Sequence, residues 1–60
     1  METKFIIVGI LESGYLSFDF VSFEPEIRSA AQFDTKEEAV KYVQKNLYGY
    51  YSVQEILVNI

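Results

Sequence analysis

The chain contains no cysteine and no histidine, and these absences remove most of the chemistry open to a protein of 60 residues. Without cysteine there is no disulfide and no thiolate zinc site, and without histidine the other common zinc ligand is missing. Ser-His-Asp and Cys-His nucleophile systems and imidazole acid–base catalysis are unavailable for the same reason. We therefore expect no catalytic residue, no metal site, no cofactor and no enzymatic activity.

Motifs for phosphate binding and for paired-carboxylate catalysis are also missing. Gly14 and Gly49 are isolated, so there is no glycine-rich loop of the kind that cradles a phosphate. Glu37 and Glu38 are adjacent on an expected helix and do not face each other. These features agree with a protein that binds rather than catalyses.

Basic residues are few, and they do not cluster. Five Lys and Arg residues stand against nine Asp and Glu, which gives a net charge of −4. Because no cation stripe is present to neutralise phosphates, we expect no nucleic-acid partner. The start of the chain lacks the basic region of a secretory signal, and no segment approaches the roughly 20 apolar residues of a membrane span. We expect a cytoplasmic protein with no membrane contact.

The length predicts a single domain, residues 1–60, that has difficulty burying enough surface. A chain of this size buries only about 60% of its unfolded surface. With no covalent or metal staple available, the remaining sources of stability are a large apolar fraction and oligomerisation. The composition is 50% hydrophobic, with five Tyr and five Phe, which supplies the first.

Two strands are expected in the first part of the chain. Residues 3–12 contain seven consecutive apolar residues at 5–11, so both faces of this strand are apolar, and Ser13-Gly14 signals a turn. Residues 15–23 alternate between apolar and polar and predict the second strand of a hairpin. Pro25 interrupts pairing, and residues 28–33 form either a short third strand or irregular chain.

A helix follows, and a final strand closes the chain. Thr35 and Glu38 satisfy a T-x-x-E capping box, which predicts that a helix begins there and ends at Asn46 or Gly49. Its apolar stripe is Ala39, Val40, Val43 and Leu47. The last strand, residues 51–60, carries apolar side chains at both parities: Ile56, Val58 and Ile60 on one face, Val53 and Leu57 on the other.

These elements predict an α+β fold of order ββ(β)αβ. A small antiparallel or mixed β-sheet of three to four strands carries one α-helix packed on one face. The last strand is expected beside the first, and a crossover through the helix allows a parallel arrangement as well as an antiparallel one.

The two central strands carry more apolar side chains than one helix can cover. If the helix packs on the other side, a second apolar face remains that contains Phe5, Ile7, Leu11, Tyr15, Val21, Phe23, Val53 and Leu57. We expect a homodimer through the sheet face or edge to cover it. The alternatives are that residues 24–33 fold back over this face, or that a different protein covers it.

Three tyrosines, Tyr48, Tyr50 and Tyr51, follow the helix closely. Either their rings pad the corner between helix and strand, with Gly49 as a left-handed cap, or they anchor an interface. The expected partner or dimer interface therefore consists of Phe5, Ile7, Tyr15, Val21, Phe23, Tyr48, Tyr50, Tyr51, Val53 and Leu57.

The segment Phe33-Asp34-Thr35-Lys36-Glu37-Glu38-Ala39 leads from extended chain into the single helix. With the small size and the order of elements, it resembles the short accessory proteins encoded by bacteriophages and other mobile elements. The resemblance implies a compact, non-enzymatic protein that binds and blocks a host protein, for example a component of restriction or CRISPR defence, in the host cell cytoplasm. That class shares no active-site motif, so no residue role is carried over.

Three hypotheses for function follow. The first is a protein-binding inhibitor or modulator of phage type that acts as a homodimer. The second is a protein that binds or sequesters a small nucleotide-like ligand in a dimer pocket lined by Tyr48, Tyr50 or Tyr51. The third is a structural oligomerisation module.

Overall fold

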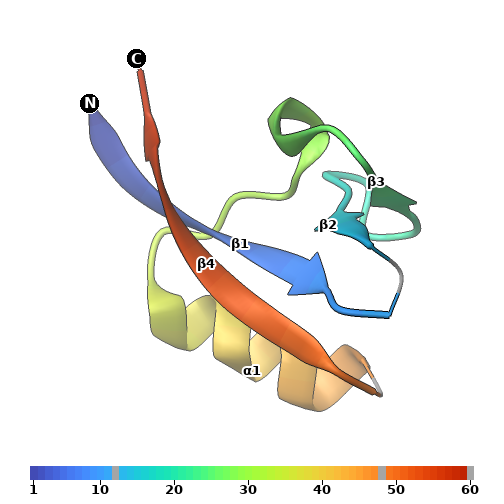
Figure 1. Cartoon of the computed structure of the whole chain (residues 1–60). Coiled ribbons are helices and arrows are strands. Elements are labelled where there is room, and N and C mark those ends of the chain that lie inside the picture. The colour runs from blue at the N-terminus through green and yellow to red at the C-terminus, as the bar shows by residue number, and fades with distance from the viewer. Residues whose placement is uncertain (12, 48, 60) are drawn as a thin grey trace.

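The computed structural model describes residues 1–11, 13–47 and 49–59. It contains one sheet with the strand order β3-β2-β1-β4 and one α-helix, which confirms the expected α+β class and order of elements (Figure 1). The elements are β1 (Glu2–Gly9), β2 (Gly14–Leu16), β3 (Phe23–Glu24), the 3-10 helix η1 (Ile27–Ser29), α1 (Lys36–Asn46) and β4 (Tyr51–Val58).

The two longest strands, β1 and β4, are paired with each other along their whole length. They pair in an unbroken antiparallel register from Glu2 opposite Val58 to Gly9 opposite Tyr51, so the start of β1 lies beside the end of β4 (Figure 1). The last strand does lie beside the first, but a parallel arrangement is wrong. The chain returns to the start of β1 before α1 begins, since Phe33 bridges to Phe5, so β4 must run back along β1.

The first hairpin is shorter than expected. Strand β1 ends at Gly9 rather than at residue 12, and Ile10 and Leu11 lie in the turn. Strand β2 ends at Leu16 rather than at residue 23, because residues 17–22 reverse the chain. The Ser17 N–H donates to the Ser22 carbonyl at 2.8 Å. Polar side chains and a tight turn therefore override the alternating pattern.

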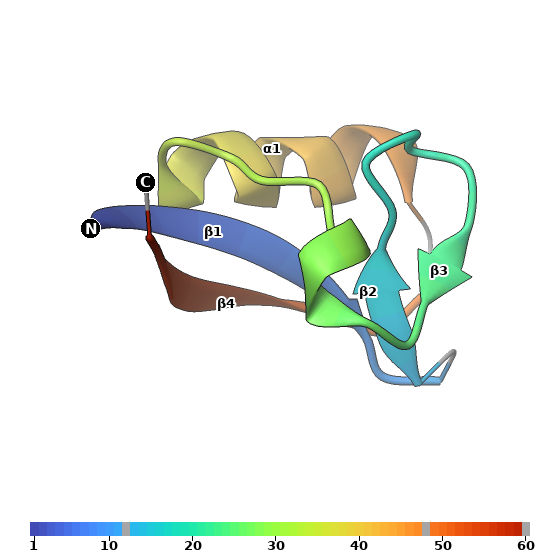
Figure 2. The ribbon, with the colours of Figure 1, turned by 90° about the horizontal axis from the view of Figure 1, so that it is seen from above.

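The segment after Pro25 returns to the sheet as irregular chain, one of the two alternatives left open. After η1, Ala30 bridges to Ser17 and Phe33 to Phe5, each as an isolated antiparallel pair. Residues 24–33 thus fold back along the edge of the sheet beside β1 and β2. In Figure 2, η1 lies beside β1 at the level of the strands, and the yellow-green chain after η1 rises toward the level of α1.

Helix α1 begins where the capping box predicts. The Glu38 N–H donates to the Thr35 hydroxyl oxygen at 3.1 Å, and that hydroxyl donates to the Glu38 carboxylate. The helix ends at Asn46, one of the two expected positions, whereas Gly49 lies beyond it with a φ of +117°. Among the described residues no helix is long and apolar enough to cross a membrane.

The core lies between α1 and one face of the sheet (Figure 2). At its centre Ile7, Leu16 and Ala39 are almost fully buried. Partly buried side chains pack around them: Phe5, Phe23, Phe33, Tyr42, Val43, Leu47, Tyr51 and Val53. Side chains from α1, from the residues that flank it and from all four strands therefore form this core.

Candidate functional site: the sheet face opposite the helix

Strand pairing decides which side chains face α1. Residues paired across an antiparallel ladder point to the same side of the sheet, and neighbours along a strand point to opposite sides. Ile7 pairs with Val53, and both contact the core under α1. The odd-numbered residues of β1 and β4 thus face the helix, while the even-numbered residues face away from it.

This parity corrects the expected interface. Phe5, Ile7, Phe23 and Val53 belong to the core beneath α1, so their assignment to a second, uncovered face was wrong. Tyr51, which was expected either to pad the corner or to anchor an interface, packs against the same core. The physical reason is that α1 packs on the odd-numbered side chains of β1 and β4, whereas the expectation requires it to pack on the other face of the sheet.

The other expected interface residues are scattered. Tyr15 lies on the face away from α1, since it pairs with Val8. Val21 is 82% exposed in the turn after β2, so it is outside the sheet. Leu57 has the parity of the helix face, yet 66% of it is exposed. Tyr48 lies outside the described residues.

The tyrosines serve different purposes. Tyr42 contacts the rings of Phe20 and Phe33, and Tyr51 stacks on Phe23 with ring centroids 5.5 Å apart. These two rings pad the core. Tyr50 is 69% exposed, and its carbonyl accepts from the Ile10 N–H, which extends the ladder and places Tyr50 on the side away from α1. Tyr50 and Tyr51 therefore point to opposite faces and do not line one pocket.

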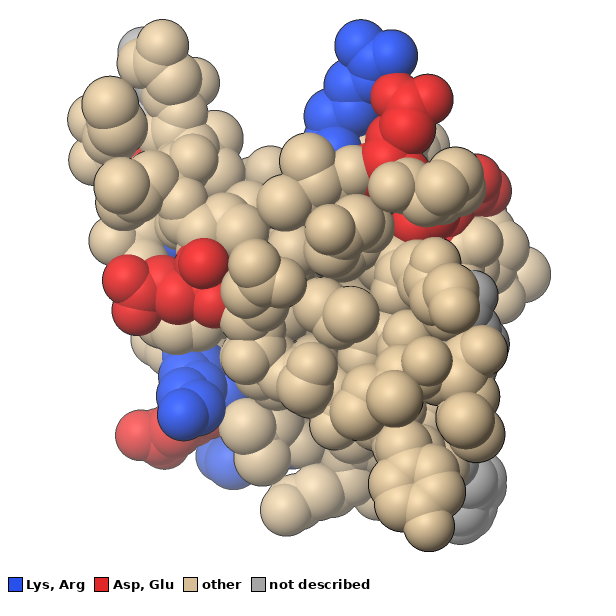
Figure 3. All heavy atoms as spheres, in the orientation of Figure 1, with Lys and Arg blue, Asp and Glu red and all other residues tan. Residues whose placement is uncertain are grey.

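The face opposite α1 carries no helix and few charges. Its uncharged residues, here called the open face, are Ile6, Val8, Ile10, Tyr15, Tyr50, Ser52, Gln54, Ile56 and Val58. Figure 3 views the molecule from this side, and charged side chains appear at the margins rather than across the middle. Ile6 is fully buried at the centre of this face, whereas Ile10 and Tyr50 at one end are 58% and 69% exposed.

Charged groups bound the open face at the far end. The Lys4 ammonium donates to Asp34 and lies 3.3 Å from a Glu2 carboxylate oxygen. These hydrogen bonds, the one to Asp34 first, raise the pKa of Lys4 above its ordinary value of 10.5. Lys4 thus remains protonated, and the carboxylates of Asp34 and Glu2 already balance its positive charge. It is therefore a poor anchor for an anionic ligand.

The turn after β2 has its own electrostatic feature. The Val21 N–H donates to the Asp19 carboxylate at 2.9 Å. This backbone hydrogen bond lowers the pKa of Asp19 below its ordinary value of 3.8. The carboxylate therefore stabilises the reversal that shortens β2, and the shift has a structural cause.

Strand β4 presents an open edge from Val53 onward. It is the last strand in the order β3-β2-β1-β4, and among the described residues the ladder partner of this part of β4 is β1. The bond from the Ile10 N–H to the Tyr50 carbonyl sets the alternation: even-numbered residues of β4 direct their backbone groups toward β1. Val53, Glu55 and Leu57 direct their N–H and C=O groups outward.

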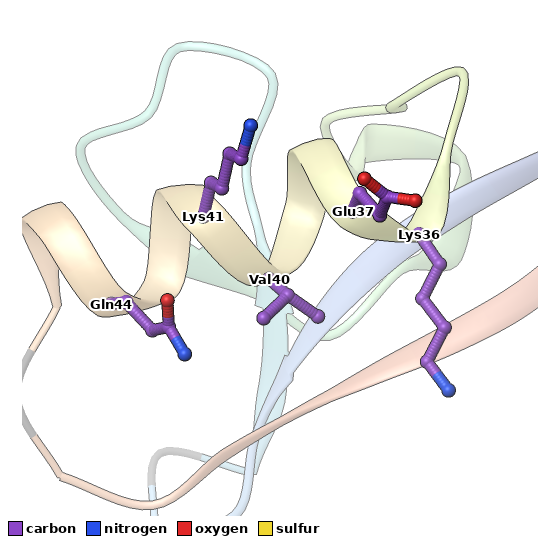
Figure 4. A pocket seen from close by; sticks show the side chains of 5 residues that line it. All are labelled: Lys36, Glu37, Val40, Lys41 and Gln44. Atoms are coloured by element: carbon purple, nitrogen blue, oxygen red, sulfur yellow. The ribbon is translucent and has the colours of Figure 1, made fainter.

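The hollows beside α1 are shallow, open grooves. One groove, of about 520 Å³, is lined by Lys36, Glu37, Val40, Lys41 and Gln44, all from the helix (Figure 4). In Figure 4, Val40, Gln44 and Lys36 point toward β4, while Lys41 points away from it. A second groove continues between the helix and β4, where Val40 and Val43 meet Val53.

The described part of the chain has no cluster of side chains suited to a metal ion. No group of three or more Asp or Glu residues there is arranged to hold a metal ion. No unpartnered polar side chain is buried among the described residues. What these residues offer is apolar surface and an unpaired strand edge, which are features of binding.

Sequence reasoning missed the residues that dominate the open face, namely Ile10, Ile56 and Val58. A usable signal was present. Lys4, Ser52 and Gln54 share their parity, and polar residues of this kind mark the side of a strand that a helix does not cover.

No protein-family model, curated protein sequence or solved structure matches this chain.

Proposed function

We propose that the chain is a non-enzymatic protein-binding module whose open face docks on another protein. The observation that carries this proposal is the uncharged stretch of sheet opposite α1, with Ile10 and Tyr50 more than half exposed at one end. Uncharged, partly apolar surface rimmed by charge is typical of docking sites, and exposed tyrosine is enriched among the residues that dominate binding energy.

The kind of partner follows from the surface. Tyr50 offers a large ring with a hydroxyl, and Ser52 and Gln54 offer exposed hydrogen-bonding groups between apolar neighbours. This combination suits a protein surface of mixed character better than a charged polymer. The resemblance to phage accessory proteins supports a host protein as the partner, with inhibition or modulation as the outcome.

The test compares two variants that alter charge equally. Ile10→Lys with Tyr50→Lys places two positive charges on the open face, whereas Glu37→Lys shifts the net charge by the same amount on the exposed surface of α1. Proteins captured from a bacterial lysate by the immobilised chain are identified by mass spectrometry. We expect one protein to be retained by the wild type and by Glu37→Lys and lost by the double variant.

Two results would count against the proposal. If the immobilised chain captured no protein above background, the proposed docking function would be refuted. Equal capture by the wild type and the double variant would place the binding site elsewhere on the molecule. Circular dichroism on each variant separates loss of binding from loss of fold.

A further inference from the structure

We propose that the outer edge of β4 is a dimerisation strand, which pairs antiparallel with β4 of a second copy about a two-fold axis at Gln54. Two sheets of four strands then become one continuous sheet, with both helices on the same side. This inference goes beyond the proposed function, since self-association does not depend on what the open face binds.

The two edges of the sheet are protected very differently. At one edge β3 has two residues and is followed directly by Pro25, so it offers almost no backbone for pairing. At the other edge β4 runs for eight residues without a proline, a lysine, an arginine or a break in register. Proteins usually blunt long edges with such devices. Strand β4 is long and carries one charged residue, Glu55, so it is the edge with backbone available for pairing.

Charge selects the register. In a two-fold antiparallel pair, the outward backbone N–H and C=O groups of one copy bond to those of the other copy. In β4 these groups belong to odd-numbered residues, namely Val53, Glu55 and Leu57, so odd-numbered residues must lie opposite odd-numbered residues. An axis at Glu55 would place that carboxylate opposite itself, and like charges directly opposite are destabilising. An axis at Gln54 places Glu55 opposite Val53 of the second copy, and each such pair can exchange two N–H···O=C bonds.

The same register places exposed apolar residues of β4, and Tyr50 just before it, opposite apolar or aromatic residues of the second copy. Leu57, which is 66% exposed although it has the parity of the helix face, comes opposite Tyr51 of the second copy. Tyr50, which is 69% exposed on the open face, comes opposite Val58. An axis at Val53 would leave Leu57 and Val58 beyond the end of the second strand.

The groove beside α1 adds a second contact. It lies on the β4 side of the helix, where Val40 and Val43 meet Val53, and it opens toward the unpaired edge. Addition of a strand at this edge brings the helix of the second copy against it from across the axis. The apolar wall of this groove, which has no cover in a single copy, would then be buried, and the assembly closes at two copies because both β4 edges are consumed.

Cysteine scanning tests the register, since the chain has no cysteine of its own. At the axis, Gln54→Cys puts two Cα atoms about 4.5 Å apart, as expected for a non-hydrogen-bonded pair, and disulfides span roughly 4.4–6.8 Å. Ser52→Cys is the matched control, since it is equally exposed on the same face. In this register its two copies are separated by about 13 Å. We expect rapid oxidative cross-linking of Gln54→Cys alone.

Light scattering tests the edge itself. We expect the wild type to have twice the mass of 7.0 kDa and Glu55→Pro to have the mass of one chain. The Glu55 N–H points outward, so proline there removes an interchain donor and leaves the ladder with β1 intact. Glu55→Gln is the matched control and should remain a dimer.

Three results would overturn the proposal. If the wild type stays monomeric at all concentrations, the dimer is refuted, and the β4 edge is available only to a different protein. A folded Glu55→Pro variant that remains dimeric moves the interface elsewhere. Cross-linking of Ser52→Cys as fast as Gln54→Cys excludes the register. The cysteine variants leave the hydrogen bonds of β4 unchanged, so this test remains valid even if Glu55→Pro does not fold.

Discussion

The burial of Ile7 beneath α1 predicts a large and specific loss of stability when its side chain is truncated. Ile7 is fully buried against Leu16 and Ala39. Ile7→Ala removes three carbon groups, which corresponds to about 2.4 kcal/mol of transfer free energy at about 0.8 kcal/mol each. The cavity left behind brings the expected loss to roughly 2–5 kcal/mol.

Ile10 is the matched control on the same chain segment. It follows directly after β1 and is 58% exposed, so the same truncation forfeits less than half of the transfer term, about 1 kcal/mol. A domain of 60 residues is expected to be stable by roughly 3–9 kcal/mol. Ile7→Ala should therefore remove most of the stability of the domain, and Ile10→Ala only a small part.

Urea unfolding followed by circular dichroism measures both losses at one protein concentration. With a slope of about 1 kcal/mol per molar urea, we expect the midpoint to fall by about 2 M or more for Ile7→Ala and by about 1 M for Ile10→Ala. Equal losses for the two variants, or the larger loss for Ile10→Ala, would show that α1 does not cover the face that carries Ile7.

Three further outcomes are expected. Thr35→Ala should lower the free energy of unfolding by about 1 kcal/mol, while Thr35→Ser should keep most of it, as measured by urea unfolding. The folded-state pKa of Asp19 is depressed, so its contribution is present above 3.8 and is lost as the pH falls through the folded-state pKa. Asp19→Asn should therefore lose less stability than the wild type on acidification, and an identical pH profile would contradict this. Leu57→Lys should dissociate the dimer without unfolding it, whereas Val43→Lys should unfold the domain by charging the core, as read by light scattering and circular dichroism.

The helix could be predicted from the sequence because its signals are local. Thr35 and Glu38 are three residues apart, and their side chains make the capping bonds within one turn. Such a signal needs no knowledge of the rest of the fold. The same holds for the closing strand, in which half of the residues in Tyr51–Val58 are β-branched or aromatic.

The short second strand could not be predicted from alternation alone. Residues 15–23 alternate as a strand would, yet the Asp19 carboxylate and the Ser17 and Ser22 backbone groups close a reversal in the middle. Phe20 adopts a φ of +62° there, which is uncommon for a residue other than glycine. Its ring packs against Phe33 and Tyr42, so tertiary contacts accompany the reversal.

The choice of sheet face depended on information that alternation does not contain. Both faces of β1 and β4 carry apolar residues, so the pattern predicts two faces and does not say which one α1 covers. The polar residues decide it: Lys4, Ser52 and Gln54 share a parity with Ile56 and Val58, and the structure leaves that side without a helix. Weighing polar residues as well as apolar ones would have predicted the open face.

The open face, and with it the proposed docking site, depends on the side of the sheet on which α1 packs. Nuclear Overhauser effects between side-chain methyl groups test this side directly. We expect contacts from Ala39 to Ile7 and from Val43 to Val53, because these residues share the core. Contacts from Ala39 or Val43 to Ile56 or Val58 would place the helix on the opposite face and contradict the proposed docking surface.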